Sequence, residues 1–160
     1  MILVDYNQVM LASLFASIGN HHNVELDENL LRHMFLNSIR FNRKKFTEEF
    51  GEIVLCVDTR DVWRRDYFPY YKANRKKSRD ESELDWTQLF GIMNTIRDEL
   101  KEFFPYKVIH MDHLEADDII GTIVHKCILD SLLFFKTSHA HSCVVSIIGI
   151  NTKKTSTHSP

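Results

Sequence analysis

Residues 2–5 (ILVD) and 52–58 (EIVLCVD) decide the fold of this chain. Each stretch is a short apolar run, rich in β-branched residues, that ends at an Asp. Such runs are typical of strands buried on both faces, and therefore of a parallel sheet covered by helices. Residues 107–111 (KVIHM), which follow Pro105, form a weaker third candidate. The sequence thus predicts three strands, two of which end at a carboxylate.

Segments of helical period separate these strands. Apolar residues recur at helical spacing in three stretches, residues 30–39, 89–103 and 116–127. Asp27 is a candidate N-cap for the first, and the second is expected to open near residues 82–85 (SELD), a capping-box pattern. This alternation predicts right-handed βαβ units, and so an α/β fold with a mainly parallel central sheet flanked by helices. In such sheets ligands bind outside the carboxyl ends of the strands, where Asp5 and Asp58 are expected.

The composition is that of one globular domain. The chain has 160 residues, of which 44% are hydrophobic and 26% charged, and these values exclude disordered and fibrous classes. Its three cysteines are widely spaced and form no CxxC pair, which argues against a disulfide framework or a zinc knuckle. No apolar run reaches the roughly 20 residues that span a bilayer. We therefore expect a cytoplasmic protein, a monomer without a membrane partner.

The charge is unevenly distributed along the chain. The net charge is −2, yet all 22 acidic residues lie at or before Asp130, and the last thirty residues carry three lysines and no acid. These last residues are also rich in Ser, Thr and His. The shift in composition predicts a domain over residues 1–130 and a divergent tail over 131–160.

Carboxylates gather where the predicted strands end. Asp5, Asp58 and residues 115–118 (EADD) each follow a predicted strand, so folding is expected to bring four or five of them to one edge of the sheet. Carboxylates held together repel one another and attract cations, and oxygen ligands favour Mg²⁺ or Mn²⁺. The alternative for residues 115–118 is structural, because acidic residues in the first turn of a helix interact favourably with its dipole.

A basic, aromatic stretch lies between the two halves of this carboxylate set. Residues 60–79 contain eight Arg or Lys and two Asp, a local charge of +6, with five aromatic residues interleaved. A charge run of this kind is often only a solvated face. Beside a carboxylate cluster, however, it suits an enzyme that cleaves phosphodiesters, since cations hold the backbone and aromatic rings stack on unpaired bases.

Taken in order, these residues resemble the 5′-nuclease superfamily, which includes flap endonucleases and the 5′-nuclease domains of bacterial DNA polymerases. The similarity lies in five ordered blocks: Asp5 and residues 53–58 (IVLCVD), 63–66 (WRRD), 71–75 (YKANR) and 115–122 (EADDIIGT). Residues 36–42 (LNSIRFN) and 77–82 (KSRDES) favour the branch of T-even bacteriophage ribonuclease H. The similarity extends from Met1 to about Lys126.

The resemblance implies a PIN-like fold with a two-metal site for Mg²⁺ (or Mn²⁺). By position, Asp5, Asp58, Glu115 and Asp117 match metal-site carboxylates, and Asp118 is a neighbour that supports them. Residues 60–82 match the helical arch, a lid over single-stranded 5′ ends, and Lys72 in it matches a catalytic cation that acts on the scissile phosphate. The residues of this arch expected to bind nucleic acid are Arg64, Arg65, Tyr71, Lys72, Arg75 and Lys76.

The implied activity is that of a metal-dependent 5′→3′ exonuclease and flap endonuclease in DNA replication. Its substrates would be DNA with a 5′ flap and RNA–DNA primer duplexes in the cytoplasm of a phage-infected host. Replication proteins, such as a single-strand-binding protein or a clamp, are the implied protein partners.

The sequence departs from the family pattern near its end. Residues 143–148 (CVVSII) are expected to form a further strand, beside the one that ends at Asp58, but Gly149 and Asn151 stand where the family has carboxylates. We therefore expect an incomplete form with impaired activity. The alternative is a non-catalytic remnant that binds nucleic acid. A third hypothesis, a phosphotransferase with Asp5 as nucleophile, is weaker because Asn7 replaces the second Asp that such enzymes need.

Overall fold

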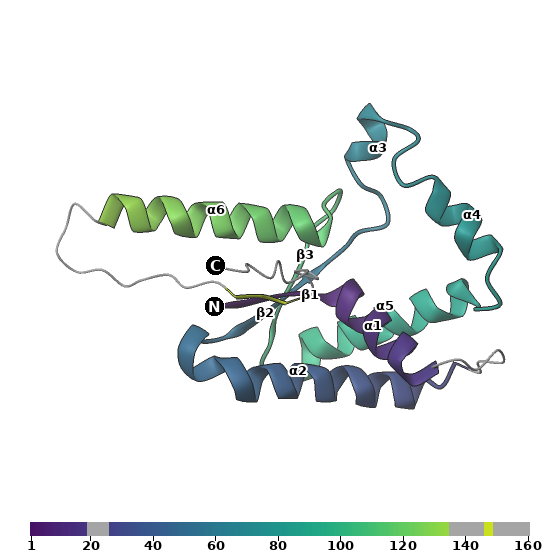
Figure 1. The fold of residues 1–160 in the computed structure, drawn as a ribbon, viewed down its shortest axis with the longest axis horizontal. Helices are drawn as coiled ribbons and strands as arrows, with labels where there is room; N and C mark the ends of the chain where they lie inside the picture. The colour runs from purple at the N-terminus through teal and green to yellow at the C-terminus, as the bar shows by residue number, and fades with distance from the viewer. Residues whose placement is uncertain (19–25, 135–145, 149–160) are drawn as a thin grey trace, which may run out of the picture.

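The structure, a computed structural model, describes residues 1–18, 26–134 and 146–148 (Figure 1). Within these ranges one parallel sheet has the strand order β3-β2-β1-β4. The strands are β1 (Ile2–Asp5), β2 (Ile53–Val57), β3 (Lys107–His110) and β4 (Ser146–Ile148). The helices are α1 (Tyr6–Ile18), α2 (Glu28–Phe50), α3 (Arg64–Tyr67), α4 (Asn74–Asp80), α5 (Trp86–Phe103) and α6 (Ala116–Phe134). The α/β fold expected from the sequence is confirmed.

The two central strands are those that the sequence identifies most clearly. Ile2 pairs with Ile53 and Asp5 with Cys56, so β1 and β2 end side by side. Their residues alternate between two cores: Ile2 and Val4 belong to one cluster of buried residues, and Leu3 to the other. A strand buried on both faces shows no polar alternation, which explains why both stretches are continuous apolar runs.

Helices cover both faces of the sheet. In Figure 1, α1, α2 and α5 lie on one side and α6 on the other. The connections from β1 to β2 and from β2 to β3 step in one direction, so a right-handed crossover puts their helices on one face. The connection from β3 returns past β2 and β1 to reach β4, and the same rule puts α6 on the opposite face. The direction changes beside β1, next to Asp5.

The placement of the fourth strand corrects the sequence-based expectation. Residues 146–148 pair with β1, the strand that ends at Asp5, whereas a place beside the strand ending at Asp58 was expected. The reason is that β3 already pairs with the other edge of β2. Gly149 and Asn151 lie outside the described residues.

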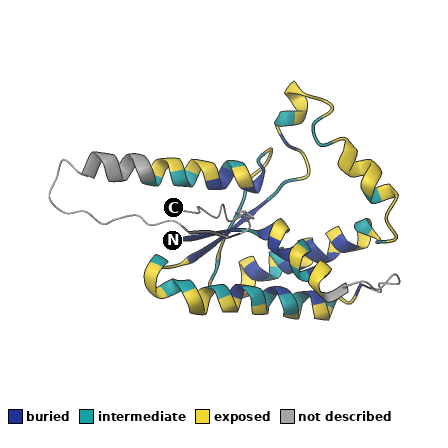
Figure 2. Cartoon of the chain, in the orientation of Figure 1, coloured by how far each residue is buried: buried dark blue, intermediate teal, exposed yellow. Residues whose placement is uncertain are grey.

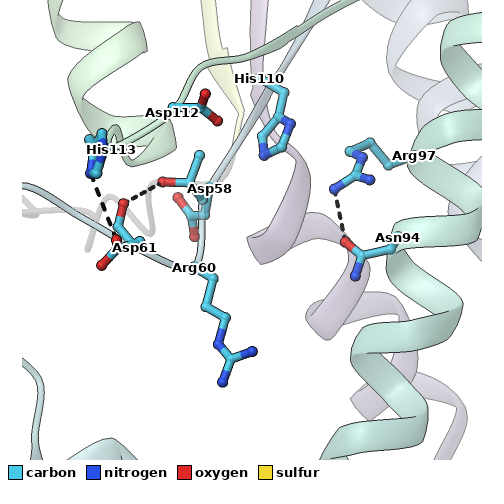
Figure 3. A pocket seen from close by; sticks show the side chains of 9 residues that line it. Asp58, Arg60, Asp61, Asn94, Arg97, His110, Asp112 and His113 are labelled. Carbon is cyan, nitrogen blue, oxygen red and sulfur yellow. Dashed lines mark hydrogen bonds and ion pairs between the residues drawn. The ribbon is translucent and has the colours of Figure 1, made fainter.

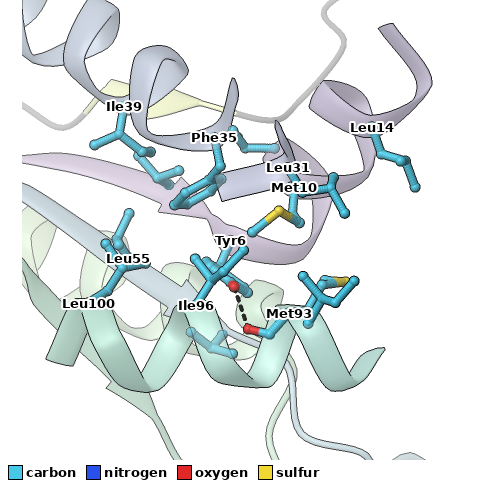
Figure 4. Packing of buried hydrophobic residues seen from close by; sticks show 14 of the residues in the cluster. Tyr6, Met10, Leu14, Leu31, Phe35, Ile39, Leu55, Met93, Ile96 and Leu100 are labelled. Atoms are coloured by element: carbon cyan, nitrogen blue, oxygen red, sulfur yellow. Dashed lines mark hydrogen bonds between the residues drawn. The ribbon is translucent and has the colours of Figure 1, made fainter. Parts of the chain in front are cut away.

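The larger core is centred on Tyr6 and Phe35, both fully buried, whose ring centroids lie 5.1 Å apart (Figure 4). The Tyr6 hydroxyl donates a 2.6 Å hydrogen bond to the Met93 carbonyl oxygen of α5. Aliphatic side chains of α2, α5 and β2 pack around this pair (Figure 4). This core fixes β1 and α1 in place, and with them the position of Asp5.

Helix capping agrees with the sequence in one case and differs in another. Asp27 caps α2 as expected, because its side chain accepts the N–H groups of Asn29 and Leu30. Helix α5 begins at Trp86 and is capped by Asp85, later than the capping box at residues 82–85 indicated. Asp85 satisfies two N–H groups of the first turn on its own, so the box is not used.

The stretch between β2 and α5 projects from the body of the fold (Figure 1). Its two short helices, α3 and α4, have no buried residue, and most of their surface is exposed (Figure 2). This segment coincides with residues 60–82, for which the family resemblance predicts the arch, and it is called the arch below. None of the helices in the described ranges has the length and apolarity needed to cross a membrane.

Candidate metal and nucleic-acid site

Asp5 and Asp58 lie at the carboxyl ends of adjacent strands. The Oδ1 atom of Asp5 accepts the N–H of Gln8 at 2.9 Å, in the first turn of α1. Burial, helped by the charges of Asp58 and Asp117, raises the pKa of Asp5 to about 6 from its ordinary value of 3.8, although the Gln8 hydrogen bond opposes the shift. Asp58 and Asp117 are therefore close enough to Asp5 to repel its charge.

Asp58 joins the end of β2 to two helices. Its Oδ1 atom accepts the N–H of Ala116, the first residue of α6, at 2.7 Å. Its Oδ2 atom accepts the side-chain amide of Asn7 at 3.0 Å. These contacts fix both oxygens at the carboxyl edge of the sheet. Sequence reasoning did not identify Asn7 as a site residue, although its position two residues after Asp5 pointed to this edge.

Glu115 is the most buried of the carboxylates and is held by the arch. Its side chain is 9% exposed. Its Oε1 atom accepts Lys72 Nζ at 2.7 Å, and its Oε2 atom accepts Arg64 Nη1 at 2.9 Å and the Tyr71 hydroxyl at 2.8 Å. Burial alone raises the pKa of a carboxyl group, but the hydrogen bonds from Lys72 and Tyr71 bring the pKa of Glu115 below its ordinary value.

Asp118 is the ion-pair partner of Arg64. The Arg64 guanidinium binds its two oxygens at 2.6 and 2.7 Å, and the Trp63 indole donates a longer bond of 3.3 Å. The Arg64 hydrogen bond lowers the pKa of Asp118. Its Oδ2 atom also accepts the Glu115 N–H at 3.0 Å, a capping contact at the start of α6. In this structure Asp118 therefore anchors the arch.

Asp117 differs from its neighbours because it is exposed and no hydrogen bond to its carboxylate occurs within the described part of the chain. The negative charge of Asp117 contributes to the raised pKa of Asp5. Among the described residues, no three His, Cys, Asp or Glu side chains stand in a ready arrangement around an ion. The donor chemistry nevertheless fits a hard divalent cation, since Asp5, Asp58 and Asp117 are oxygen donors at one edge, and the charges of Asp58 and Asp117 both act on Asp5. Glu115 and Asp118 are bound to arch cations.

The basic residues of the arch form two groups. Arg64, Lys72 and Tyr71 bind Glu115, the residue before α6, and Arg64 also binds Asp118 in the first turn of that helix. Arg65, Arg75 and Lys76 are exposed, and Arg65 donates to the Arg60 carbonyl oxygen at 3.1 Å. Exposed aromatic rings accompany this second group: Tyr67 is 84% exposed, Phe68 56% and Tyr70 76%. The exposed group is free to meet a polyanion and unpaired bases.

A pocket opens beside Asp58, between the ends of β2 and β3 and the side of α5 (Figure 3). Its volume is about 510 Å³, and its lining residues are Asp58, Thr59, Arg60, Asp61, Asn94, Arg97, His110, Asp112 and His113. Burial and the nearby charge of Arg97 lower the pKa of His110. Sequence reasoning did not predict this pocket; the polar residues that follow the third predicted strand were the available signal.

The sheet order, the carboxylates at its edge and the basic arch together define a class of protein. Residues 1–134 match the family of 5′-3′ exonucleases through its N-terminal resolvase-like domain, and the chain belongs to this family. The resemblance deduced from the sequence is thereby confirmed.

One relative is the ribonuclease H of Enterobacteria phage T4, which is 40% identical over 131 residues. The aligned region covers 80% of this chain and 42% of that protein. A solved structure, the T5 D15 protein co-crystallized with metal ions, matches with a TM-score of 0.55 and 19% identity over 81% of this chain and 43% of that one. It supports the fold. The chain spans less than half the length of either protein.

Proposed function

We propose that this chain contributes the part of a 5′→3′ exonuclease and flap endonuclease that binds the metal and holds the nucleic-acid strand. The enzyme would act on 5′ flaps and RNA primers in phage DNA replication, in the host cytoplasm. The observation that carries the proposal is the position of Asp5 and Asp58 at the carboxyl ends of adjacent strands, with the charge of Asp117 close enough to act on Asp5. A divalent cation offsets the repulsion of Asp5 by these charges.

Each group of residues has a separate task in this proposal. Asp5, Asp58 and Asp117 would hold Mg²⁺ or Mn²⁺, which supplies an activated water and stabilises the leaving oxygen of an in-line displacement. The exposed cations Arg65, Arg75 and Lys76 would bind phosphates, and the exposed rings beside them would stack on unpaired bases. Lys72, whose ammonium contacts Glu115 beside this edge, would add positive charge at the reacting phosphate.

A second candidate function is nucleic-acid binding without catalysis. It is favoured because the Glu115 carboxylate already accepts hydrogen bonds from three side chains and is therefore less available to a metal ion. We accordingly expect slow turnover from this chain.

Cleavage of a 5′-labelled flap and of an RNA primer annealed to DNA separates the two functions. For the nuclease, the parent chain is expected to cleave slowly, only with Mg²⁺ or Mn²⁺, and Asp58→Asn is expected to abolish cleavage. Binding without any cleavage would select the second function. Cleavage that persists in a chelator, or that Asp58→Asn leaves unchanged, would contradict the proposed site.

Removing one exposed arch cation should change the salt dependence of binding. Arg75 is exposed on α4, so Arg75→Ala is expected to weaken single-strand binding and to lower the salt slope by about one unit, the loss of one phosphate contact. Affinities measured by fluorescence anisotropy at several salt concentrations test this. Lys107→Ala, on β3 and away from the arch, is the matched control. Equal slopes for Arg75→Ala and the parent would remove the arch from the binding surface.

A further inference from the structure

The carboxylate of Glu115 is already fully engaged. Lys72, Arg64 and Tyr71 occupy three of the four acceptor positions that a carboxylate offers, and the side chain is only 9% exposed. A divalent cation at the neighbouring carboxylates would add positive charge beside Arg64 and Lys72, which both already contact the Glu115 carboxylate. Because like charges repel, the binding of a divalent cation by Glu115 and the contact with both arch cations oppose each other.

The three donors do not hold Glu115 equally firmly. Arg64 also binds Asp118 through both oxygens, and its ring neighbours Trp63 and Tyr71 lie 4.8 and 5.7 Å from its guanidinium. The start of the arch is tied down as well, because Val62 forms a bridge with His113 and Trp63 N–H donates to the His113 carbonyl oxygen. Arg64 is thus fixed from several sides.

Lys72 is held much less firmly. Its exposed fraction equals that of Arg64, but Glu115 is its single ion-pair partner within the described ranges, and one ring, that of Tyr71, lies 5.0 Å from its ammonium. Its backbone has φ of +54°, in the left-handed region that costs energy for a residue with a side chain. The contact with Glu115 compensates for this strain, so loss of the contact lets the backbone relax. The residues after it, in α4, have no buried side chain to hold them.

We propose that Lys72 and a divalent cation compete for Glu115, so that metal binding releases the Tyr71–Lys72 end of the arch while the Arg64–Asp118 pair remains as its hinge. This inference rests on the proposed function and adds a coupling within it. In the metal-free protein the ammonium of Lys72 supplies the positive charge beside Glu115 that a divalent cation would otherwise supply. When a cation arrives, Lys72 becomes available to the phosphate of a bound strand. Metal loading thereby opens the arch before the substrate is held.

Titration calorimetry with Mn²⁺ on the whole chain tests the competition. Lys72→Met removes the competing ammonium and keeps the length of the side chain, so Mn²⁺ should bind about tenfold more tightly, the worth of one charged hydrogen bond. Lys77→Met removes an equal charge from α4 at an exposed site that pairs only with Glu81 among the described residues, and should bind like the parent. Tyr71→Phe, a milder change, should tighten binding by a smaller factor.

Amide hydrogen exchange separates release from a general charge effect. Saturating Mg²⁺ should speed exchange in residues 70–76 of the parent and leave α5 unchanged. The proposal is overturned if Lys72→Met binds Mn²⁺ no more tightly than the parent, or if Mg²⁺ slows exchange in residues 70–76; in both cases metal binding by the parent leaves the proposed function standing. If neither the parent nor any variant binds Mn²⁺, the proposed function itself fails, and the competition with it.

Discussion

Replacing Arg64 with Met should lower the free energy of unfolding by about 2 to 3 kcal/mol and separate the arch from α6. Arg64 is the only residue in the described ranges that forms ion pairs with both Glu115 and Asp118. Its loss leaves two poorly exposed carboxylates next to each other with one remaining cation, Lys72, which pairs with Glu115 and not with Asp118 in the described ranges. The cost lies below that of a fully buried pair because the Arg64 side chain is 28% exposed.

Chemical denaturation of Arg64→Met and Arg65→Met measures this difference. Arg65 is adjacent and exposed, and its guanidinium meets only a backbone carbonyl among the described residues, so Arg65→Met should change stability by less than about 0.5 kcal/mol. Equal stabilities for the two variants would mean that the Arg64 contacts with α6 do not hold the arch.

Asp5→Asn should stabilise the metal-free protein by up to about 3 kcal/mol at pH 7.5. The pKa of Asp5 is raised from 3.8 to about 6, so the folded state binds the proton more tightly than the unfolded state. Stability is therefore highest where Asp5 is protonated and is lost as the pH rises from about 4 to about 6. Asn removes the charge and still accepts the Gln8 N–H, as an N-cap does.

Urea unfolding in a chelator at several pH values tests the sign as well as the size. The advantage of Asp5→Asn over the parent should vanish near pH 4 and reach a plateau above pH 7. The exposed Asp66→Asn variant serves as control and should show no such pH dependence. A constant advantage at every pH would attribute the effect to packing, and a destabilised Asp5→Asn at pH 7.5 would show that folding does not raise the pKa of Asp5.

The edge of the sheet could be predicted from sequence because the signal is local. Two apolar runs that end at Asp5 and Asp58 report both the strands and the position where each stops. The neighbour of the fourth strand was predicted wrongly. Residues 107–111 form a strand that occupies the outer edge of β2, so that edge is not free for the fourth strand. That stretch is short and only partly buried, so its sequence pattern is weak.

The contacts of Glu115 could not be predicted for a different reason. They depend on residues 64–72 folding back onto the start of α6, more than forty positions along the chain. The spacing of apolar residues along the sequence gives no sign of such a contact, and a basic run is equally compatible with a solvated face. The sequence therefore led us to predict Arg64, Tyr71 and Lys72 as nucleic-acid contacts, which stays a prediction, but did not show that they hold carboxylates in the free protein.

The thermal stability of the parent chain and of Asp58→Asn, measured with and without Mg²⁺, tests the metal-binding edge most directly. At a Mg²⁺ concentration ten times the dissociation constant, the parent should gain about 1.4 kcal/mol, a rise of about 3 to 6 °C in Tm. Asp58→Asn keeps an acceptor for the Ala116 N–H, so its fold is retained, but its Tm should respond to Mg²⁺ much less. A parent Tm that does not move with Mg²⁺, or a shift equally large in Asp58→Asn, would contradict the assignment of Asp5, Asp58 and Asp117 as the metal-binding carboxylates.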